Sequence, residues 1–82
     1  MKINLEVEHA SGEKTAVVCS APDIVKFEDR YDIAITKAAQ DMKLTHLLFL
    51  AHAAMLRQGK TKLNFEDWTL DVEGIGASDS PK

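Results

Sequence analysis

Residues 45–59 limit the folds available to this chain more than any other segment. They include no proline, are rich in Leu, Ala and Met, begin with a capping residue and end at glycine, which predicts one helix of about four turns. The polar residues of this helix are few: His46, His52, Arg57 and Gln58. Because nearly its whole circumference is apolar, it must be covered on several sides, by the rest of the chain or by a partner.

The segment at the start of the chain predicts an antiparallel β-hairpin over residues 1–19. Ile3, Leu5 and Val7 alternate with polar residues, which is the period of a strand with one buried face. A turn that ends at Gly12 leads to a second strand-like run. A lone hairpin is marginally stable in water, so we expect its apolar face to lie on the helices or to extend a neighbouring subunit's sheet.

Helix-start signals precede three other segments. Serine, proline and aspartate begin a predicted helix over residues 22–31. Thr36 can cap a short helix over residues 36–42, whose boundary with the central helix the sequence leaves open. Asn64 can cap a last helix, which we expect to end at Gly74.

These segments together predict an α+β fold, with an N-terminal antiparallel β-hairpin followed by a small bundle of three to four α-helices around a central apolar helix. We expect a single domain over residues 1–75, with the hairpin in residues 1–19 and the helical part in residues 22–75. The small, polar residues 76–82 predict a flexible tail. A chain of 82 residues is near the size at which oligomers or ligands often add to the stability of a single core.

Charge and cysteine content restrict the classes of partner and the cellular setting. The formal net charge of −3 at pH 7 argues against binding to nucleic acid or to an anionic membrane. The central helix is too short, and too interrupted by histidine, to span a bilayer. Cys19 is the only cysteine, and no charged-then-apolar leader opens the chain, so we expect a cytoplasmic protein.

The sequence predicts no catalytic, cofactor or metal site. His46 and His52 are six residues apart, so they project about 240° from each other on a helix and cannot share a metal ion. Cys19 has no adjacent histidine or glycine-rich oxyanion element. Phosphate loops, dinucleotide fingerprints and serine elbows are absent from the sequence. We therefore expect a protein that is not an enzyme and has no cofactor.

The charged groups at predicted helix ends have an ordinary structural interpretation. The carboxylates of residues 66–73 match the positive end of a helix dipole or face solvent. Arg57, Lys60 and Lys62 surround the predicted end of the central helix, where cations complement the dipole. A weak contact of these three cations with an acidic partner is the alternative.

Several short motifs follow one another in a characteristic order. They are Phe27-Glu28 with Tyr31, the apolar residues 47–54, Arg57 with Gly59, and residues 64–68 with residues 71–73. In this order and spacing, over roughly residues 22–75, the chain resembles the tail assembly chaperones of long-tailed bacteriophages.

The resemblance implies a small protein of the host cytoplasm that binds the long, aggregation-prone tape measure protein. In such families the chaperone keeps the tape measure protein soluble until tail tube subunits assemble around it. Tail tube subunits and further copies of the chain are the other partners that we consider. A longer form made by ribosomal frameshifting is often found in these families.

A chaperone of this kind needs exposed apolar surface that can cover helical segments of its client. We place the client groove between two predicted flanking helices and one side of the central helix. The candidate residues are Phe27, Tyr31, Leu47, Leu48, Ala51, Met55 and Trp68. Packing in the core is the alternative for each of them.

Two other functions remain open from the sequence. The chain could be a small oligomeric structural module that stays in the finished virion. It could also be an antitoxin or transcription-regulator domain, although its negative charge and the lack of a basic helix face argue against this.

Overall fold

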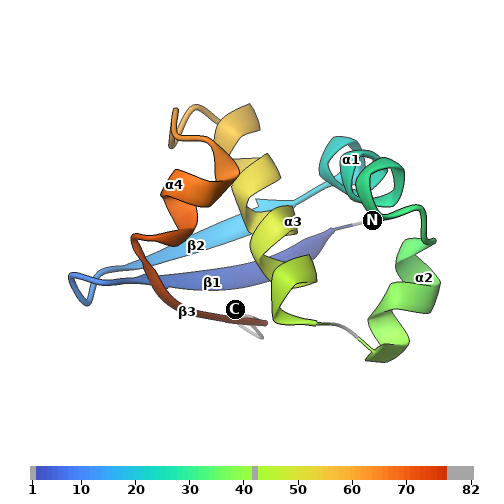
Figure 1. Cartoon of the computed structure of the whole chain (residues 1–82), viewed down its shortest axis with the longest axis horizontal. Coiled ribbons are helices and arrows are strands. Elements are labelled where there is room, and N and C mark those ends of the chain that lie inside the picture. Colours follow the sequence, from blue (N-terminus) through green and yellow to red (C-terminus); the bar gives the residue numbers. More distant parts are fainter. Residues whose placement is uncertain (1, 42, 78–82) are drawn as a thin grey trace.

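The computed structural model describes residues 2–41 and 43–77, and it shows a three-stranded antiparallel sheet with four α-helices among them. In chain order the elements are β1 (Ile3–His9), β2 (Lys14–Cys19), α1 (Ala21–Tyr31), α2 (Ile35–Ala38), a 3₁₀ turn (Ala39–Asp41), α3 (Leu44–Arg57), α4 (Phe65–Thr69) and β3 (Val72–Ala77). The strand order is β2-β1-β3. The predicted α+β class, with its hairpin and central helix, is confirmed (Figure 1).

The β1–β2 hairpin forms as the alternating pattern predicts. Ile3 pairs with Cys19, and Val7 pairs with Thr15, in antiparallel register. Leu5 and Val7 are buried and their neighbours along β1 are exposed, so one face of the sheet is apolar.

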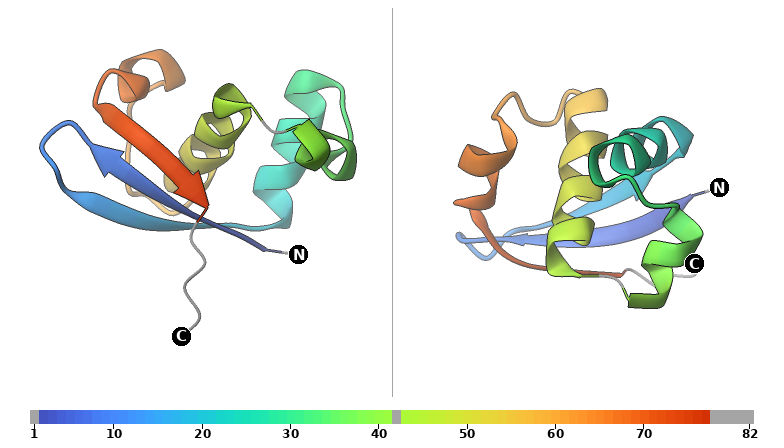
Figure 2. Two further views of the ribbon diagram at one scale, coloured as in Figure 1. Left: turned by 90° about the horizontal axis from the view of Figure 1, so that it is seen from below. Right: turned by 45° about the vertical axis from the view of Figure 1, so that its right-hand side comes forward.

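Helix α3 lies across this apolar face, with α1 on one side and α4 on the other (Figure 1). Leu50, Ala51 and Ala54 of α3 are buried against the core. Seen from the opposite side, the strands lie in front of α1, α3 and α4, and this second face of the sheet has no helix over it among the described residues (Figure 2). The molecule therefore has two layers, with the core between the sheet and the helices.

The prediction of a last helix ending at Gly74 is wrong beyond Thr69. Asn64 caps α4 as expected, because its side-chain oxygen accepts a hydrogen bond from the Asp67 N–H at 2.8 Å. After a turn the chain enters β3, where Ile75 pairs with Val7 of β1. Gly74 and Gly76 disfavour a helix here, whereas Val72 and Ile75 favour a strand. Without β3, the side of β1 that faces away from β2 would have no strand to pair with.

The predicted flexible tail over residues 76–82 is also corrected in part. Gly76 and Ala77 belong to β3, where Gly76 pairs with Glu6. Residues 78–82 lie outside the described residues. The domain boundary predicted at residue 75 therefore falls inside a strand.

The second predicted helix, over residues 36–42, begins earlier and ends earlier as an α-helix, and its predicted last residue, 42, lies outside the described residues. Helix α2 starts at Ile35, its N-cap is Ala34 and not Thr36, and it tightens into the 3₁₀ turn after Ala38. The Ile35 N–H donates to Glu28 Oε2 of α1 at 2.7 Å. A carboxylate of α1 thus accepts a hydrogen bond from the first turn of α2, in place of a capping side chain next to that helix. The residues around Thr36 could not predict this contact.

Candidate functional site

A row of half-buried rings connects α3 with the two helices that flank it. We call Tyr31, His46, Phe49 and Phe65 the aromatic row. Tyr31 of α1 lies 5.0 Å from His46 and 5.5 Å from Phe49, measured between ring centroids. Phe49 lies 6.0 Å from Phe65 of α4. The row therefore crosses from α1 over α3 to α4.

Buried rings support the aromatic row from below. The Phe27 ring, which is fully buried, lies 5.1 Å from Tyr31 and meets His46 edge-on at 5.2 Å. On the α4 side, Trp68 is 2% exposed and stacks at 6.4 Å on Phe65. Edge-to-face and stacked pairs each add about 0.5–1.5 kcal/mol beyond area burial, so these contacts stabilise the positions of the rings in the row.

Two histidines fix the ends of the helices that carry the row. The backbone N–H of Lys43 donates to His46 Nδ1 at 3.4 Å, at the start of α3. His52 is buried, and its Nε2 donates to the Leu63 carbonyl at 2.8 Å, which holds the loop before α4. Because a carbonyl can only accept, the proton of neutral His52 sits on Nε2.

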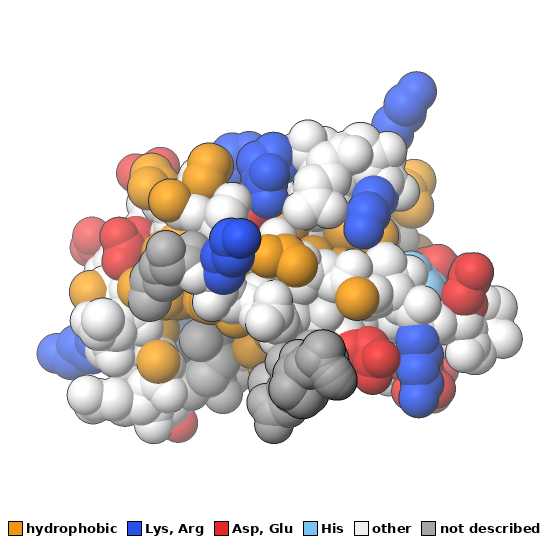
Figure 3. Space-filling model, turned by 180° about the vertical axis from the view of Figure 1, so that it is seen from behind, with side chains coloured by type: hydrophobic (Ala, Val, Ile, Leu, Met, Phe, Trp, Pro, Cys, Tyr) orange, Lys and Arg blue, Asp and Glu red, His pale blue; other side chains and the backbone are white. Residues whose placement is uncertain are grey.

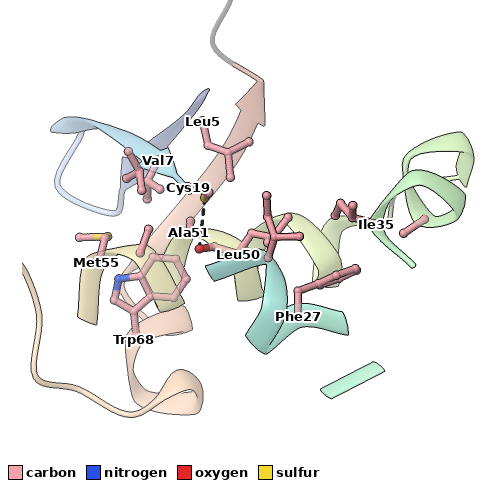
Figure 4. Close-up of a cluster of buried hydrophobic side chains, with 13 residues drawn as sticks. Leu5, Val7, Cys19, Phe27, Ile35, Leu50, Ala51, Met55 and Trp68 are labelled. Carbon is pink, nitrogen blue, oxygen red and sulfur yellow. Dashed lines mark hydrogen bonds between the residues drawn. The ribbon is translucent and has the colours of Figure 1, made fainter. Parts of the chain in front are cut away.

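The structure divides the seven predicted groove residues into two groups. Phe27, Ala51, Met55 and Trp68 are buried in the core and cannot touch a partner in this conformation. Figure 4 shows Phe27 and Trp68 on opposite sides of Leu50, pointing into the core. For these four residues the alternative of core packing applies.

Tyr31, Leu47 and Leu48 are half-buried, so for them the groove remains a prediction. His46, Phe49 and Phe65 were not among the candidates predicted from the sequence. The sequence feature that indicates them is the apolar circumference of the central helix, because its apolar residues that do not contact the sheet must contact other helices or a partner. Which residues those are depends on how the helix is rotated on the sheet.

The interpretation of Arg57 as a cation that complements a helix dipole is incomplete. Its Nη2 donates to Asp23 Oδ2 at 3.0 Å and its Nε donates to Asp23 Oδ1 at 3.1 Å. Asp23 is fully buried, and it also accepts a hydrogen bond from the Ser20 N–H at 2.9 Å. The hydrogen bond to Asp23 raises the pKa of Arg57. This ion pair joins the end of α3 to the start of α1.

Cys19 lies beside this ion pair and is fully buried. Its Sγ donates to the Leu50 carbonyl at 3.3 Å (Figure 4). Burial raises the pKa of the Cys19 thiol to about 12, with a further increase from Asp23 and an opposing effect of Arg57. The thiol is therefore protonated and inaccessible at neutral pH, which fits a structural cysteine.

We expect the native Cys19 thiol to react with iodoacetamide at least about a hundredfold more slowly than the unfolded chain does, near pH 8. The folded thiol keeps its proton up to about pH 12, whereas an ordinary thiol releases it near 9.0. The contribution of this group to stability is therefore fully present below pH 9 and is lost as the pH rises toward 12. Urea unfolding at increasing pH measures this loss of stability. In the Cys19→Ala variant, the part of the pH dependence that comes from the thiol should be absent. Equal labelling rates for native and unfolded chains would contradict the burial argument.

Two further classes of site find no support within residues 2–41 and 43–77. No three His, Cys, Asp or Glu side chains there lie close enough together to hold a metal ion. None of the described helices has the length and apolarity needed to cross a membrane.

Comparison with known proteins adds no family, because no protein-family model, curated protein or solved structure matches this chain.

Proposed function

We propose that this chain is a tail assembly chaperone that binds a tape measure protein in the host cytoplasm and keeps it soluble until tail tube subunits assemble. The observation that supports this proposal most directly is the aromatic row, since it joins three helices and leaves four rings half-buried. The order of motifs in the sequence suggests the same function.

The aromatic row suits the binding of an amphipathic client helix. Aromatic rings offer large apolar area at low conformational entropy cost, because each side chain has only two rotatable bonds. An apolar face presented at i, i+3, i+4 and i+7 by a helix can lie along such a row. Because the rings are only half exposed, the contact area is modest, and a modest contact allows release of the client when tube subunits arrive.

Exposed hydrophobic side chains elsewhere are more scattered. On the side opposite to that of Figure 1, they form small groups separated by charged side chains (Figure 3). Single exposed hydrophobic residues are normal for a protein surface and need no partner. This contrast favours the aromatic row as the client contact.

Co-expression with the long, helix-rich protein encoded just downstream tests the proposal. We expect a larger soluble fraction of that protein in the presence of the chain, and co-purification of the two. Unchanged solubility with no complex would contradict the proposal. Retention of the chain in purified virions, detected by mass spectrometry, would favour a structural module instead.

The Tyr31→Ser variant should weaken client binding by about tenfold or more, because interface aromatics often contribute over 1 kcal/mol. The matched control is Val25→Ser on the same helix, which removes an apolar side chain that is 62% exposed and lies outside the aromatic row. Calorimetric titration with a soluble client fragment measures both affinities, and circular dichroism confirms that both variants fold. Equal losses in the two variants would place the contact elsewhere.

A further inference from the structure

The two edges of the sheet differ in how their backbone groups are satisfied. On β2, the Val18 carbonyl accepts hydrogen bonds from Arg57 Nη2 at 3.4 Å and Gln58 Nε2 at 3.2 Å. The Ala16 carbonyl accepts one from Lys60 Nζ at 3.5 Å. Side chains at the end of α3 and just after it therefore occupy the outer edge of β2 and block pairing with another strand there.

On β3 the outer edge has no such cover from described residues. Backbone groups of successive strand residues point alternately to the two sides. Since the carbonyls of Ala16 and Val18 point away from β1, the even-numbered residues of β1 face β3. There they pair with Gly74 and Gly76, so the N–H and C=O of Ile75 point outward. No described residue forms a hydrogen bond with these two Ile75 groups.

A shallow hollow of about 200 Å³ adjoins this edge on the sheet face that no described helix covers. Glu6 and Glu8 border it from β1, and Gly74 and Gly76 border it from β3. A Cβ added at either glycine would meet no atom within 4 Å, and neither glycine has a positive φ. Their backbone conformation and surroundings therefore do not demand glycine. Because glycine has no side chain, Gly74 and Gly76 leave the carboxylates of Glu6 and Glu8 accessible from the outer side of β3.

An added strand would place every second side chain on this same face. It would lie about 10 Å from β1, a gap that a lysine or arginine side chain and a glutamate side chain can bridge together. Lys14 of β2, which pairs with Glu8, also borders the hollow. Among the described residues it forms no ion pair with Glu6 or Glu8, so the two carboxylates outnumber it and remain available to a cation from the β3 side. Acidic side chains in the added strand would be repelled.

We propose that the outer edge of β3 binds an extended segment of a partner protein in which lysine or arginine occupies alternate positions. Backbone hydrogen bonds to β3 supply the pairing, and Glu6 and Glu8 select for positive charge. The selecting side chains lie on the face of the sheet opposite to the helices that carry the aromatic row. The proposal is therefore independent of the chaperone function.

An NMR titration of the isotope-labelled chain tests this proposal with a defined probe. The probe is a synthetic, end-capped peptide with lysine at alternate positions and valine between them. We expect saturable shifts of the amide signals of residues 74–76, slower hydrogen exchange at Ile75, and an affinity that falls with salt. A peptide with glutamate in place of lysine should bind at least about tenfold more weakly.

The protein variants separate this site from non-specific attraction. Gly74→Thr combined with Gly76→Thr fills the hollow with side chains that suit a strand, and should lower the affinity for the lysine peptide at least about tenfold while the fold is kept. The matched control is Ala16→Thr, an exposed position across Glu6 on β2, which should bind as the parent chain does.

Three results would overturn the proposal: equal binding of the glutamate peptide, unchanged affinity of the double glycine variant, or no saturable binding. Dimerisation of the chain through residues 74–76 would also overturn it, because a second copy would then occupy this edge.

Discussion

Replacing Arg57 by methionine should lower the free energy of unfolding by about 1–3 kcal/mol, the cost of leaving the buried Asp23 carboxylate short of donors. The Arg57 side chain itself is 34% exposed, so the loss is smaller than for a pair in which both partners are buried. The substitution keeps an apolar stem but removes both donors that reach the Asp23 carboxylate at 3.0–3.3 Å. Asp23 is fully buried, so it would remain in the interior with only the Ser20 N–H as a partner. An uncompensated buried charge costs more than the ion pair contributes, which makes this one of the largest expected effects.

Urea unfolding followed by the fluorescence of Trp68, the single tryptophan, measures this change. The matched control is Lys62→Met, an exposed cation a few residues away, which should change stability by less than about 0.5 kcal/mol. The double variant Asp23→Asn with Arg57→Met should recover part of the loss, because it removes the buried charge as well. A loss below about 1 kcal/mol for Arg57→Met would show that Asp23 finds another partner or water.

Replacing Trp68 by alanine should destabilise the chain by about 3–5 kcal/mol. Trp68 is 2% exposed and contacts the rings of His52 and Phe65, so its removal leaves a large cavity between α3 and α4. Trp68→Phe should cost less, because a ring remains in the cavity. It also removes Nε1, a buried donor with no partner among the described residues.

Circular dichroism during urea unfolding measures both Trp68 variants, since the fluorophore is lost. Leu70→Ala serves as the control, because Leu70 directly follows α4 and is 82% exposed. Its stability should match that of the parent chain within about 0.5 kcal/mol. If Trp68→Ala kept its stability and lost only client binding, Trp68 would be a groove residue as first predicted and not part of the core.

Local patterns were sufficient for the elements whose residues alternate or repeat strongly. The alternation of Leu5 and Val7 predicted β1, and the composition of residues 45–59 predicted α3. In these segments the preference of each residue and the burial pattern favour the same structure. The strand β3 was not predicted for two reasons. Its glycines and Glu73 make the period-two alternation of apolar residues weak, and the helix-start signal at Asn64 favoured a helix that continues to Gly74.

The candidate site required the tertiary structure. The sequence identified the three helices between which the client groove is proposed, but it could not give the rotation of α3 on the sheet. That rotation buries Ala51 and Met55 and turns Phe49 toward Tyr31 and Phe65. When a helix is apolar nearly all round, its hydrophobic pattern does not favour one orientation, and packing against the neighbouring elements decides it.

The sequence by itself determined the α+β class, the hairpin, the central helix and the lack of a recognisable catalytic motif, because these depend on local periodicity and residue type. Only the tertiary structure decided that β3 joins the sheet, that Arg57 neutralises Asp23, and which rings form the aromatic row. Each of these depends on contacts between residues far apart in the chain. Such contacts are chosen by the pairing of unsatisfied strand edges, by the cost of a buried charge and by close packing, and none of these is a property of a local segment.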